Sequence, residues 1–407
     1  MSLARFGHHA TSSTYHMAYD TRRKRRTNRR VTAHTVTNKR PHLTSATAPS
    51  LYKYTMLPSP SLQQPTPIEM AVESSETPCP PFPLIGDEDD VGGHENQAAA
   101  EVPQGEALEL PTVDLEAPGP ALDAACRGLG IFRLANHGVP ADLTARLFAL
   151  ARDLLGRTPF PEKKAQPGYF WGTPEEPSRR VRPRDVNWIE GYHVHLAQPR
   201  PIAVGPPPPS DDDPALGDLV AEYADHMARV ARRLFDAIAE ALCLDADRTA
   251  SYINEHGGYL RVHRYPRCPE PGHHGIQAHT DSTTLSIINQ DAASGGSGGL
   301  QVHHDGAWRD LAAPGVPDDG ALLVNLGDMA KAISADAYRS VPHRVVASMG
   351  DDERLSLCYF AFPRDDAVVS CDGSRYRPFT VPEFRAQVQA DLKAIGSKVG
   401  LERFLRH

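Results

Sequence analysis

The chain has 407 residues, 40% of them hydrophobic, which is enough for one large domain or two small ones with an apolar core. No apolar run approaches the roughly 18 residues that a membrane-spanning helix needs. The six cysteines are scattered and form no CxxC pair, which argues against a disulfide scaffold and favours a reducing compartment, with the cytoplasm as the expected location.

The net charge of −8 is unevenly distributed along the chain. Residues 1–68 carry eleven Lys or Arg and a single acid, Asp20, so they contribute +10 and the other 339 residues contribute −18. An acidic body argues against nucleic acid or a membrane surface as the main partner.

Residues 1–107 do not have the pattern of a folded domain. The first half is rich in Ser, Thr and Arg, the second half is Pro-rich and then acidic, and neither has a sustained apolar period, so disorder is expected. Three interpretations of the basic part stay open. It is a targeting segment (organellar, or nuclear through Arg22 to Arg26), or plain disorder, or a start-site artefact in which translation begins near Met70.

Residues 108–250 are predicted to form a largely helical region. Strands are expected over residues 110–115 and 131–134, and helices over residues 121–129, 141–155 and 219–242. In the last helix apolar side chains recur every three or four residues, which predicts one buried stripe. Tyr169, Trp171 and Trp188, in the stretch between the last two helices, would either form a lid or simply pack.

Residues 251–365 have the sequence pattern of an antiparallel β-sandwich or barrel. Short strands are expected over residues 259–264, 283–289, 299–303, 307–311, 321–325, 343–347 and 355–362. Asp305-Gly306 between two of them predicts a hairpin turn. Residues 366–407 form a tail, with a closing helix expected over residues 382–406.

A possible metal site lies in the strand-rich region. Two imidazoles and one carboxylate on one face suit an iron(II) that must keep open positions for other ligands. His279, Asp281 and His343 fit this pattern, because strands are expected directly after Asp281 and at His343. The His-x-Asp pair alone is weak evidence, since nineteen histidines make a chance pair expected. A second pair, ending at Asp305, is discounted because Asp305 suits the turn.

A candidate anion site follows His343 on the next strand. Alternation places Arg354 and Ser356 on one face of that strand. A buried arginine is costly unless it meets an anion, and a guanidinium beside a hydroxyl suits a carboxylate. The alternative is a surface arginine on an edge strand.

The chain resembles the plant 2-oxoglutarate- and iron(II)-dependent dioxygenases of specialised and hormone metabolism over about residues 108–407. The resemblance is carried by an ordered set of motifs: residues 110–115, 130–140, Tyr265 to Pro269, His279 to Asp281, Gly299 to Val302, Asn325 to Asp328, Ser340 to Val345 and Arg354 to Ser356. It implies an α+β, mainly β fold: a double-stranded β-helix, or jelly roll, flanked by helices.

The resemblance also implies the roles of the site residues. His279, Asp281 and His343 would hold iron(II), while Arg354, Ser356 and Tyr265 would bind the far carboxylate of 2-oxoglutarate. One departure is at His263-Arg264, where the family usually has Asn-Tyr. This departure leaves open how the iron-side end of 2-oxoglutarate is supported.

The activity implied is oxidative decarboxylation of 2-oxoglutarate by dioxygen, coupled to oxidation of a small-molecule substrate, with ascorbate expected as an assay additive. Several stretches are similar to gibberellin oxidases, particularly the 2-oxidases that inactivate the hormone. Phe360 is a candidate wall of the substrate site or an ordinary core aromatic.

Two alternatives stay open. The first is the same chemistry on a flavonoid, an auxin or another specialised metabolite. The second is a non-catalytic protein whose basic N-terminus associates with nucleic acid. The intact ligand set and the acidic body argue against this second alternative. The family resemblance implies a monomer in the cytosol, and the basic run adds the nucleus as a possible second location.

Overall fold

The computed structural model describes residues 77–85, 106–173, 182–196, 204–207, 215–291, 299–312, 320–350 and 353–406. The chain divides into two units, residues 1–70 and 71–407, and all described residues belong to the second. Within the described ranges no helix is both long and apolar enough to cross a membrane.

The larger of the two main sheets has eight strands in the order β1-β2-β10-β7-β12-β5-β4-β3. Their bounds are β1 (Thr112–Asp114), β2 (Ile131–Ala135), β3 (Tyr169–Trp171), β4 (Glu190–His195), β5 (Tyr259–Tyr265), β7 (Leu285–Gln290), β10 (Leu322–Leu326) and β12 (Arg354–Ala361). β1 and β2 are parallel, and the other neighbours are antiparallel.

The smaller main sheet has four strands in the order β6-β11-β8-β9. These are β6 (His274–His279), β11 (His343–Val346), β8 (Leu300–His304) and β9 (Ala307–Asp310). The predicted hairpin turn joins β8 to β9, and both its residues have positive φ, 48° at Asp305 and 78° at Gly306.

The two sheets pack face to face around a small apolar core. Leu323 and Tyr265 of the large sheet belong to one buried cluster with Leu300, Val302 and Val345 of the small sheet. Gly275 of β6 is required by this packing, because a Cβ there would lie 2.6 Å from the Tyr265 ring. The fold class is confirmed: a jelly-roll sandwich flanked by helices.

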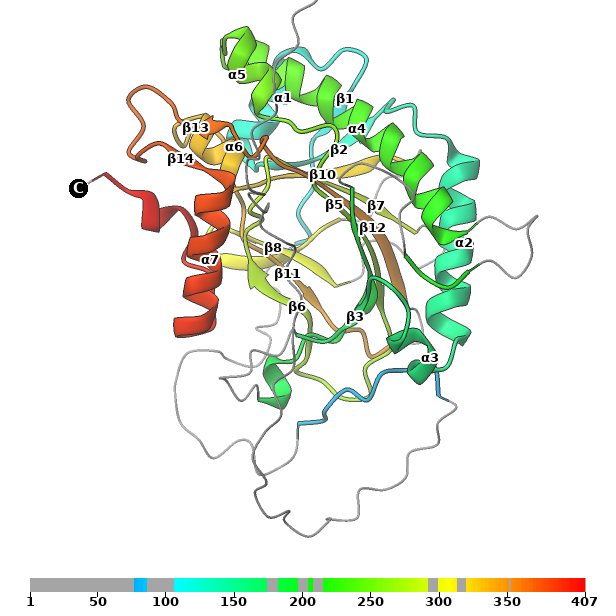
Figure 1. The fold of residues 1–407 in the computed structure, drawn as a ribbon. Helices are drawn as coiled ribbons and strands as arrows, with labels where there is room; N and C mark the ends of the chain where they lie inside the picture. The colour runs from blue at the N-terminus through cyan, green and yellow to red at the C-terminus, as the bar shows by residue number, and fades with distance from the viewer. Residues whose placement is uncertain are drawn as a thin grey trace, which may run out of the picture. The chain divides into compact units, whose positions relative to one another are not determined.

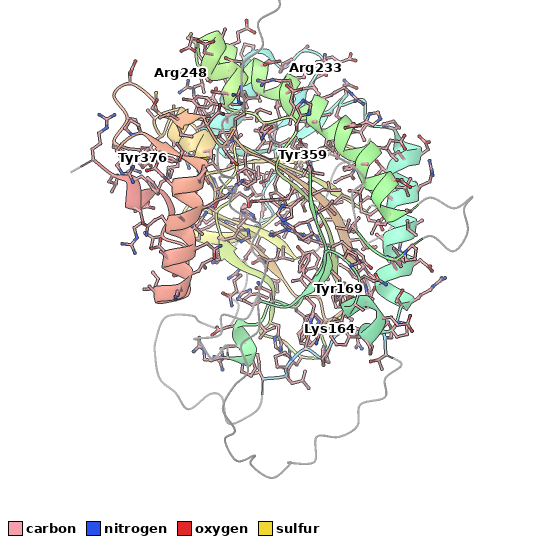
Figure 2. All side chains as sticks on the ribbon, in the orientation of Figure 1. Lys164, Tyr169, Arg233, Arg248, Tyr359 and Tyr376 are labelled. Atoms are coloured by element: carbon pink, nitrogen blue, oxygen red, sulfur yellow. The ribbon has the colours of Figure 1, made fainter. Side chains whose placement is uncertain are left out.

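Helices cover the outer face of the large sheet (Figure 1). They are α1 (Gly119–Gly128), α2 (Ala141–Arg157) and α4 (Leu216–Ala241). The predicted stripe of α4 is buried, including Met227 and Leu234. It packs toward outward-facing side chains of β12 such as Tyr359, labelled in Figure 2. Each fully buried apolar side chain of this size contributes about 1.5–3 kcal/mol, so this layer fixes the large sheet.

The C-terminal helix ends earlier than predicted. Helix α7 covers Val381–Ile395, not residues 382–406, and Gly396 follows it with a φ of 76°. The left-handed glycine ends the helix by donating its N–H to the carbonyl of Leu392. A 3-10 helix, Gly400–Phe404, completes the tail.

Shorter elements complete the described fold. These are α3 (Phe160–Lys164), α5 (Ala246–Ser251), α6 (Asp328–Ile333), a 3-10 helix at Pro183–Asp185, and the two-stranded sheet of β13 (Val368–Val369) and β14 (Phe379–Thr380).

Residues 77–85 have a defined place on the fold, although they lie in the extension predicted to be disordered. Phe82 stacks on Trp188 with ring centres 4.4 Å apart and meets Trp171 edge-on at 5.5 Å. The N–H of Ile85 donates to the carboxylate of Glu270 at 2.6 Å. Trp171 and Trp188 therefore pack against this segment, and residues 1–76 and 86–105 lie outside the described part of the chain.

Candidate metal centre

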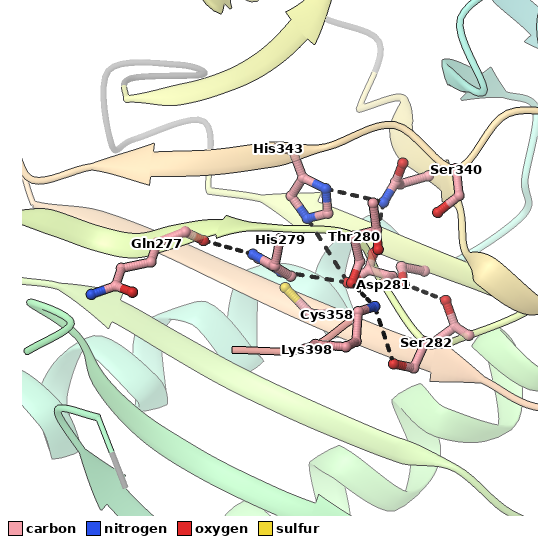
Figure 3. Close-up of polar contacts among 12 residues, drawn as sticks. Gln277, His279, Thr280, Asp281, Ser282, Ser340, His343, Cys358 and Lys398 are labelled. Carbon is pink, nitrogen blue, oxygen red and sulfur yellow. Dashed lines mark hydrogen bonds and ion pairs between the residues drawn. The ribbon is translucent and has the colours of Figure 1, made fainter. Parts of the chain in front are cut away.

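Strand pairing brings the three predicted metal ligands together. His279 is the last residue of β6, Asp281 follows two residues later, and His343 is the first residue of β11. His343 lies opposite His279 in the β6–β11 ladder, which closes a separation of 64 positions in the sequence. One ligand atom from each residue lies within 4.8 Å of the other two (Figure 3).

Backbone hydrogen bonds orient both imidazoles. The Nδ1–H of His279 donates to the carbonyl of Gln277 at 2.8 Å, and that of His343 donates to the carbonyl of Val341 at 3.2 Å. The two Nε2 atoms then face Oδ1 of Asp281, at 3.6 and 3.8 Å. Fixing the tautomer through the other ring nitrogen is the usual arrangement for histidines that bind a metal.

The ionisation of the cluster also suits a cation. Burial would raise the pKa of Asp281, but the neighbouring His343 and His279 outweigh it and hold the pKa well below its ordinary value. Burial, with His279 nearby, lowers the pKa of His343 to about 4. At neutral pH the cluster thus presents a carboxylate and a neutral His343 imidazole, the forms that bind metals.

Asn325 of β10 holds the carboxylate, a role that sequence reasoning did not assign. Its side-chain amide donates to Oδ2 of Asp281 at 2.7 Å. Gly327, two residues later, allows the close approach of the loop that follows Asp281, because a Cβ there would lie 2.2 Å from the carbonyl oxygen of Thr283. Asn325 and Gly327 both belong to the Asn-Leu-Gly-Asp motif, which is the feature of the sequence that could have pointed to them.

A second support comes from the C-terminal tail (Figure 3). Nζ of Lys398 lies 2.8 Å from Oδ2 of Asp328 and also donates to the carbonyl of Thr280, the residue between His279 and Asp281. Ser340 donates to the other oxygen of Asp328 at 2.9 Å. The loop that carries Asp281 is thus tied to both α6 and the tail.

Arg354 lies on the inner face of the large sheet at the start of β12. It pairs in register with Tyr265, and its guanidinium lies 4.8 Å from the centre of that ring. Its side chain is buried, and among the described residues Nε and Nη1 have no hydrogen-bond partner. Ser356, also buried, shares this face. A buried guanidinium with unused donors beside a hydroxyl can bind a carboxylate.

The unusual His263-Arg264 pair divides between the two faces of β5. His263 is buried on the inner face, with Nε2 unpartnered among the described residues, and burial holds its pKa well below the ordinary value. Arg264 lies on the outer face and pairs with Glu190 and Glu353. The neutral His263 imidazole thus takes the place where the family usually has Asn.

The remaining predicted positions can also be located. Phe360 is half-buried on the inner face, four residues after Ser356. Asp305 of the discounted second pair is in the β8–β9 turn, where it lies 3.3 Å from Nε2 of His304. No second group of three possible ligands occurs in the described ranges.

Comparison with known proteins gives one consistent family. Residues 256–363 match the model of the 2OG-Fe(II) oxygenase superfamily. Gibberellin 2-beta-dioxygenase 8 of Arabidopsis thaliana is 33% identical over 324 residues, which cover 74% of this chain and 88% of that protein. Gibberellin 2-beta-dioxygenase 6 of Oryza sativa subsp. japonica is 36% identical over 325 residues, covering 74% and 86%.

A solved structure of a dioxygenase has a similar fold. The rice dioxygenase for auxin oxidation superposes with a TM-score of 0.55 at 26% identity, covering 73% of this chain and 100% of that one.

Proposed function

Because the chain belongs to the 2OG-Fe(II) oxygenase superfamily and is a dioxygenase that uses iron(II) and 2-oxoglutarate, we propose that His279, Asp281 and His343 hold its iron. The observation that carries this assignment is the convergence of two Nε2 atoms on Oδ1 of one buried carboxylate. This donor set is the facial triad of non-haem iron(II) oxygenases, which leaves positions open for other ligands.

We further propose that Arg354 and Ser356 bind the far carboxylate of 2-oxoglutarate, with Tyr265 beside them. The unused donors of buried Arg354 support this assignment, since an anion would satisfy them. Burial raises the pKa of Tyr265, so its phenol stays protonated and able to donate. His263, buried opposite Ser356 on the same inner face, is proposed to contact the bound 2-oxoglutarate.

When bound, iron and 2-oxoglutarate would allow dioxygen to oxidise a C–H bond of the substrate, with release of succinate and carbon dioxide. The chain's own residues bind and orient the reactants, and the apolar sandwich around them excludes water. No side-chain general base is assigned. The predictions of an oxidoreductase acting on a small molecule, and of its cofactors, are confirmed.

We propose a gibberellin as the substrate, with 2β-hydroxylation that inactivates the hormone. The names of the two relatives support this, and Phe360 is proposed as a wall of the substrate site. Auxin is the second candidate, because the rice neighbour is an auxin-oxidising dioxygenase.

The substrate is tested by incubating purified protein with iron(II), 2-oxoglutarate and ascorbate, separately with a gibberellin, indole-3-acetate and a flavanone. A hydroxylated gibberellin formed together with succinate is expected. Turnover of the flavanone alone would overturn the substrate proposal and leave the reaction class intact.

We propose that the protein acts as a monomer in the cytosol, without binding nucleic acid. The six free thiols support a reducing compartment, and the acidic body opposes nucleic acid. Light scattering and microscopy of a fluorescent fusion test these points; a nuclear signal would favour the basic run as an address. We also propose region boundaries at residues 107, 250 and 365, which separate the N-terminal extension, the helical region, the jelly-roll domain and the C-terminal tail.

A further inference from the structure

Arg261 lies on the inner face of the large sheet and has no part in the iron or 2-oxoglutarate sites. It alternates along β5 with His263 and Tyr265 and pairs in register with Cys358 of β12. Its guanidinium lies 5.9 Å from the centre of the Phe170 ring and 5.6 Å from that of Phe360. A cation is thus held between two aromatic side chains.

The charge of Arg261 has no counter-ion among the described residues. Its Nε donates to Nδ1 of His193 at 2.9 Å, and no described carboxylate forms an ion pair with it. Burial, followed by the charge of Arg261, lowers the pKa of His193 to about 4, so this partner is neutral at physiological pH. A partly desolvated guanidinium without an acid is costly, and its two Nη groups are available to an anion.

The inner face has a deep end and an outer end. On β12, Arg354 and Ser356 are buried whereas Phe360 is half-buried; on β5, Tyr265 and His263 are buried whereas Arg261 is half-buried. Arg354 therefore lies at the closed end, and Arg261 at the end that a larger molecule can reach.

We propose that Arg261 binds a carboxylate of the molecule that is oxidised, and that Phe170 and Phe360 contact the apolar body of that molecule. The substrate class is then an apolar carboxylic acid, not a neutral compound. This rests on the proposed function, because it assumes that Arg354 holds 2-oxoglutarate. Gibberellins and auxins are such acids, whereas flavanones are neutral, so Arg261 separates the substrates considered above.

The test compares each acid with its methyl ester on full-length protein loaded anaerobically with iron(II) and 2-oxoglutarate. The probes are a gibberellin and indole-3-acetate, and binding is followed by the change in the visible spectrum of the loaded enzyme. Because charged hydrogen bonds are involved, the wild type is expected to bind the acid about 10- to 100-fold more tightly than the ester.

Variants assign the effect to the residue. Arg261→Gln is expected to weaken binding of the acid about 10- to 100-fold and leave the ester unchanged, while Arg261→Lys recovers part of the affinity. The matched control is Arg364→Gln, which removes the same charge from an exposed residue that pairs with Asp366. All three variants should keep the wild-type affinity for 2-oxoglutarate.

The inference is overturned by equal binding of acid and ester by the wild type, by no binding of any acid, or by an Arg261→Gln variant that still prefers the acid. Loss of 2-oxoglutarate binding in Arg261→Gln would mean that Arg261 serves the co-substrate, which also overturns it. Failure of the wild type to bind iron and 2-oxoglutarate would instead count against the proposed function itself.

Discussion

The side-chain amide of Asn325 donates a 2.7 Å hydrogen bond to Oδ2 of Asp281, while Oδ1 of the same carboxylate faces the two imidazoles. One oxygen is thus held by the sheet and the other is directed at the proposed metal position. The hydrogen bond from Asn325 restricts rotation of the carboxylate. Hydrogen-bond partners behind metal ligands commonly have this orienting role.

Replacing Asn325 by Leu should weaken iron binding about 10- to 100-fold, because the carboxylate loses its orienting donor. Equilibrium titration with iron(II) under anaerobic conditions measures the effect. Asn254→Leu, in the turn before β5, is the control and should bind iron like the wild type. Unchanged affinity in Asn325→Leu would show that the backbone alone positions Asp281.

Replacing Arg354 by Met should raise the KM for 2-oxoglutarate about 100-fold, because charged hydrogen bonds of roughly 1.5–3 kcal/mol are lost. Arg354→Lys should give an intermediate value, since a single ammonium cannot reproduce the guanidinium fork. Initial rates of succinate formation over a 2-oxoglutarate series give both constants. A KM that stays within about twofold of the wild type would exclude Arg354 from the co-substrate site.

We expect Lys398 to position the proposed metal-binding loop, residues 279–281, through the carbonyl of Thr280 and the carboxylate of Asp328. Lys398→Met should speed iron loss to a chelator about tenfold, with little change in the KM for 2-oxoglutarate. Lys393→Met, exposed in the last turn of α7, is the control. Equal iron-release rates in the two variants would restrict Lys398 to a structural role.

Glu190 should be the most sensitive position for stability outside the site. It is fully buried and accepts hydrogen bonds from Lys163 at 2.5 Å, from Tyr169 at 2.6 Å, and from Arg264. Glu190→Gln leaves buried Lys163 without a carboxylate partner, while Arg264 keeps Glu353, and should lower the free energy of unfolding by about 3–5 kcal/mol. Urea unfolding measures this free energy. The control is exposed Glu162→Gln, which should stay within about 0.5 kcal/mol of the wild type. Similar free energies of unfolding for the two variants would contradict the expectation.

Much of the fold was predictable where residues face the core with a regular period. Helix α4 was predicted from its apolar stripe, and the β8–β9 hairpin from Asp305-Gly306. Strands β4 and β6 were missed because their polarity hides them. Glu190 is buried in β4 through ion pairs formed with distant residues, which no local pattern reveals.

The residues proposed as metal ligands could be picked out from the sequence, whereas the residues that support them could not. His279, Asp281 and Arg354 were proposed from residue types that suit iron and an anion, and the structure brings each to the inner side of the sandwich. Asn325 and Lys398 act through contacts between segments far apart in the sequence. Such roles depend on tertiary packing, and therefore appear only in three dimensions.

The most direct test of the iron and 2-oxoglutarate assignments is the visible spectrum of the full-length protein loaded anaerobically with both. A weak charge-transfer band is expected in the wild type and in Arg364→Gln, lost in His279→Ala and weakened in Arg354→Ala. Absence of the band from folded wild type supplied with iron, or a band that His279→Ala leaves unchanged, would contradict the proposed site.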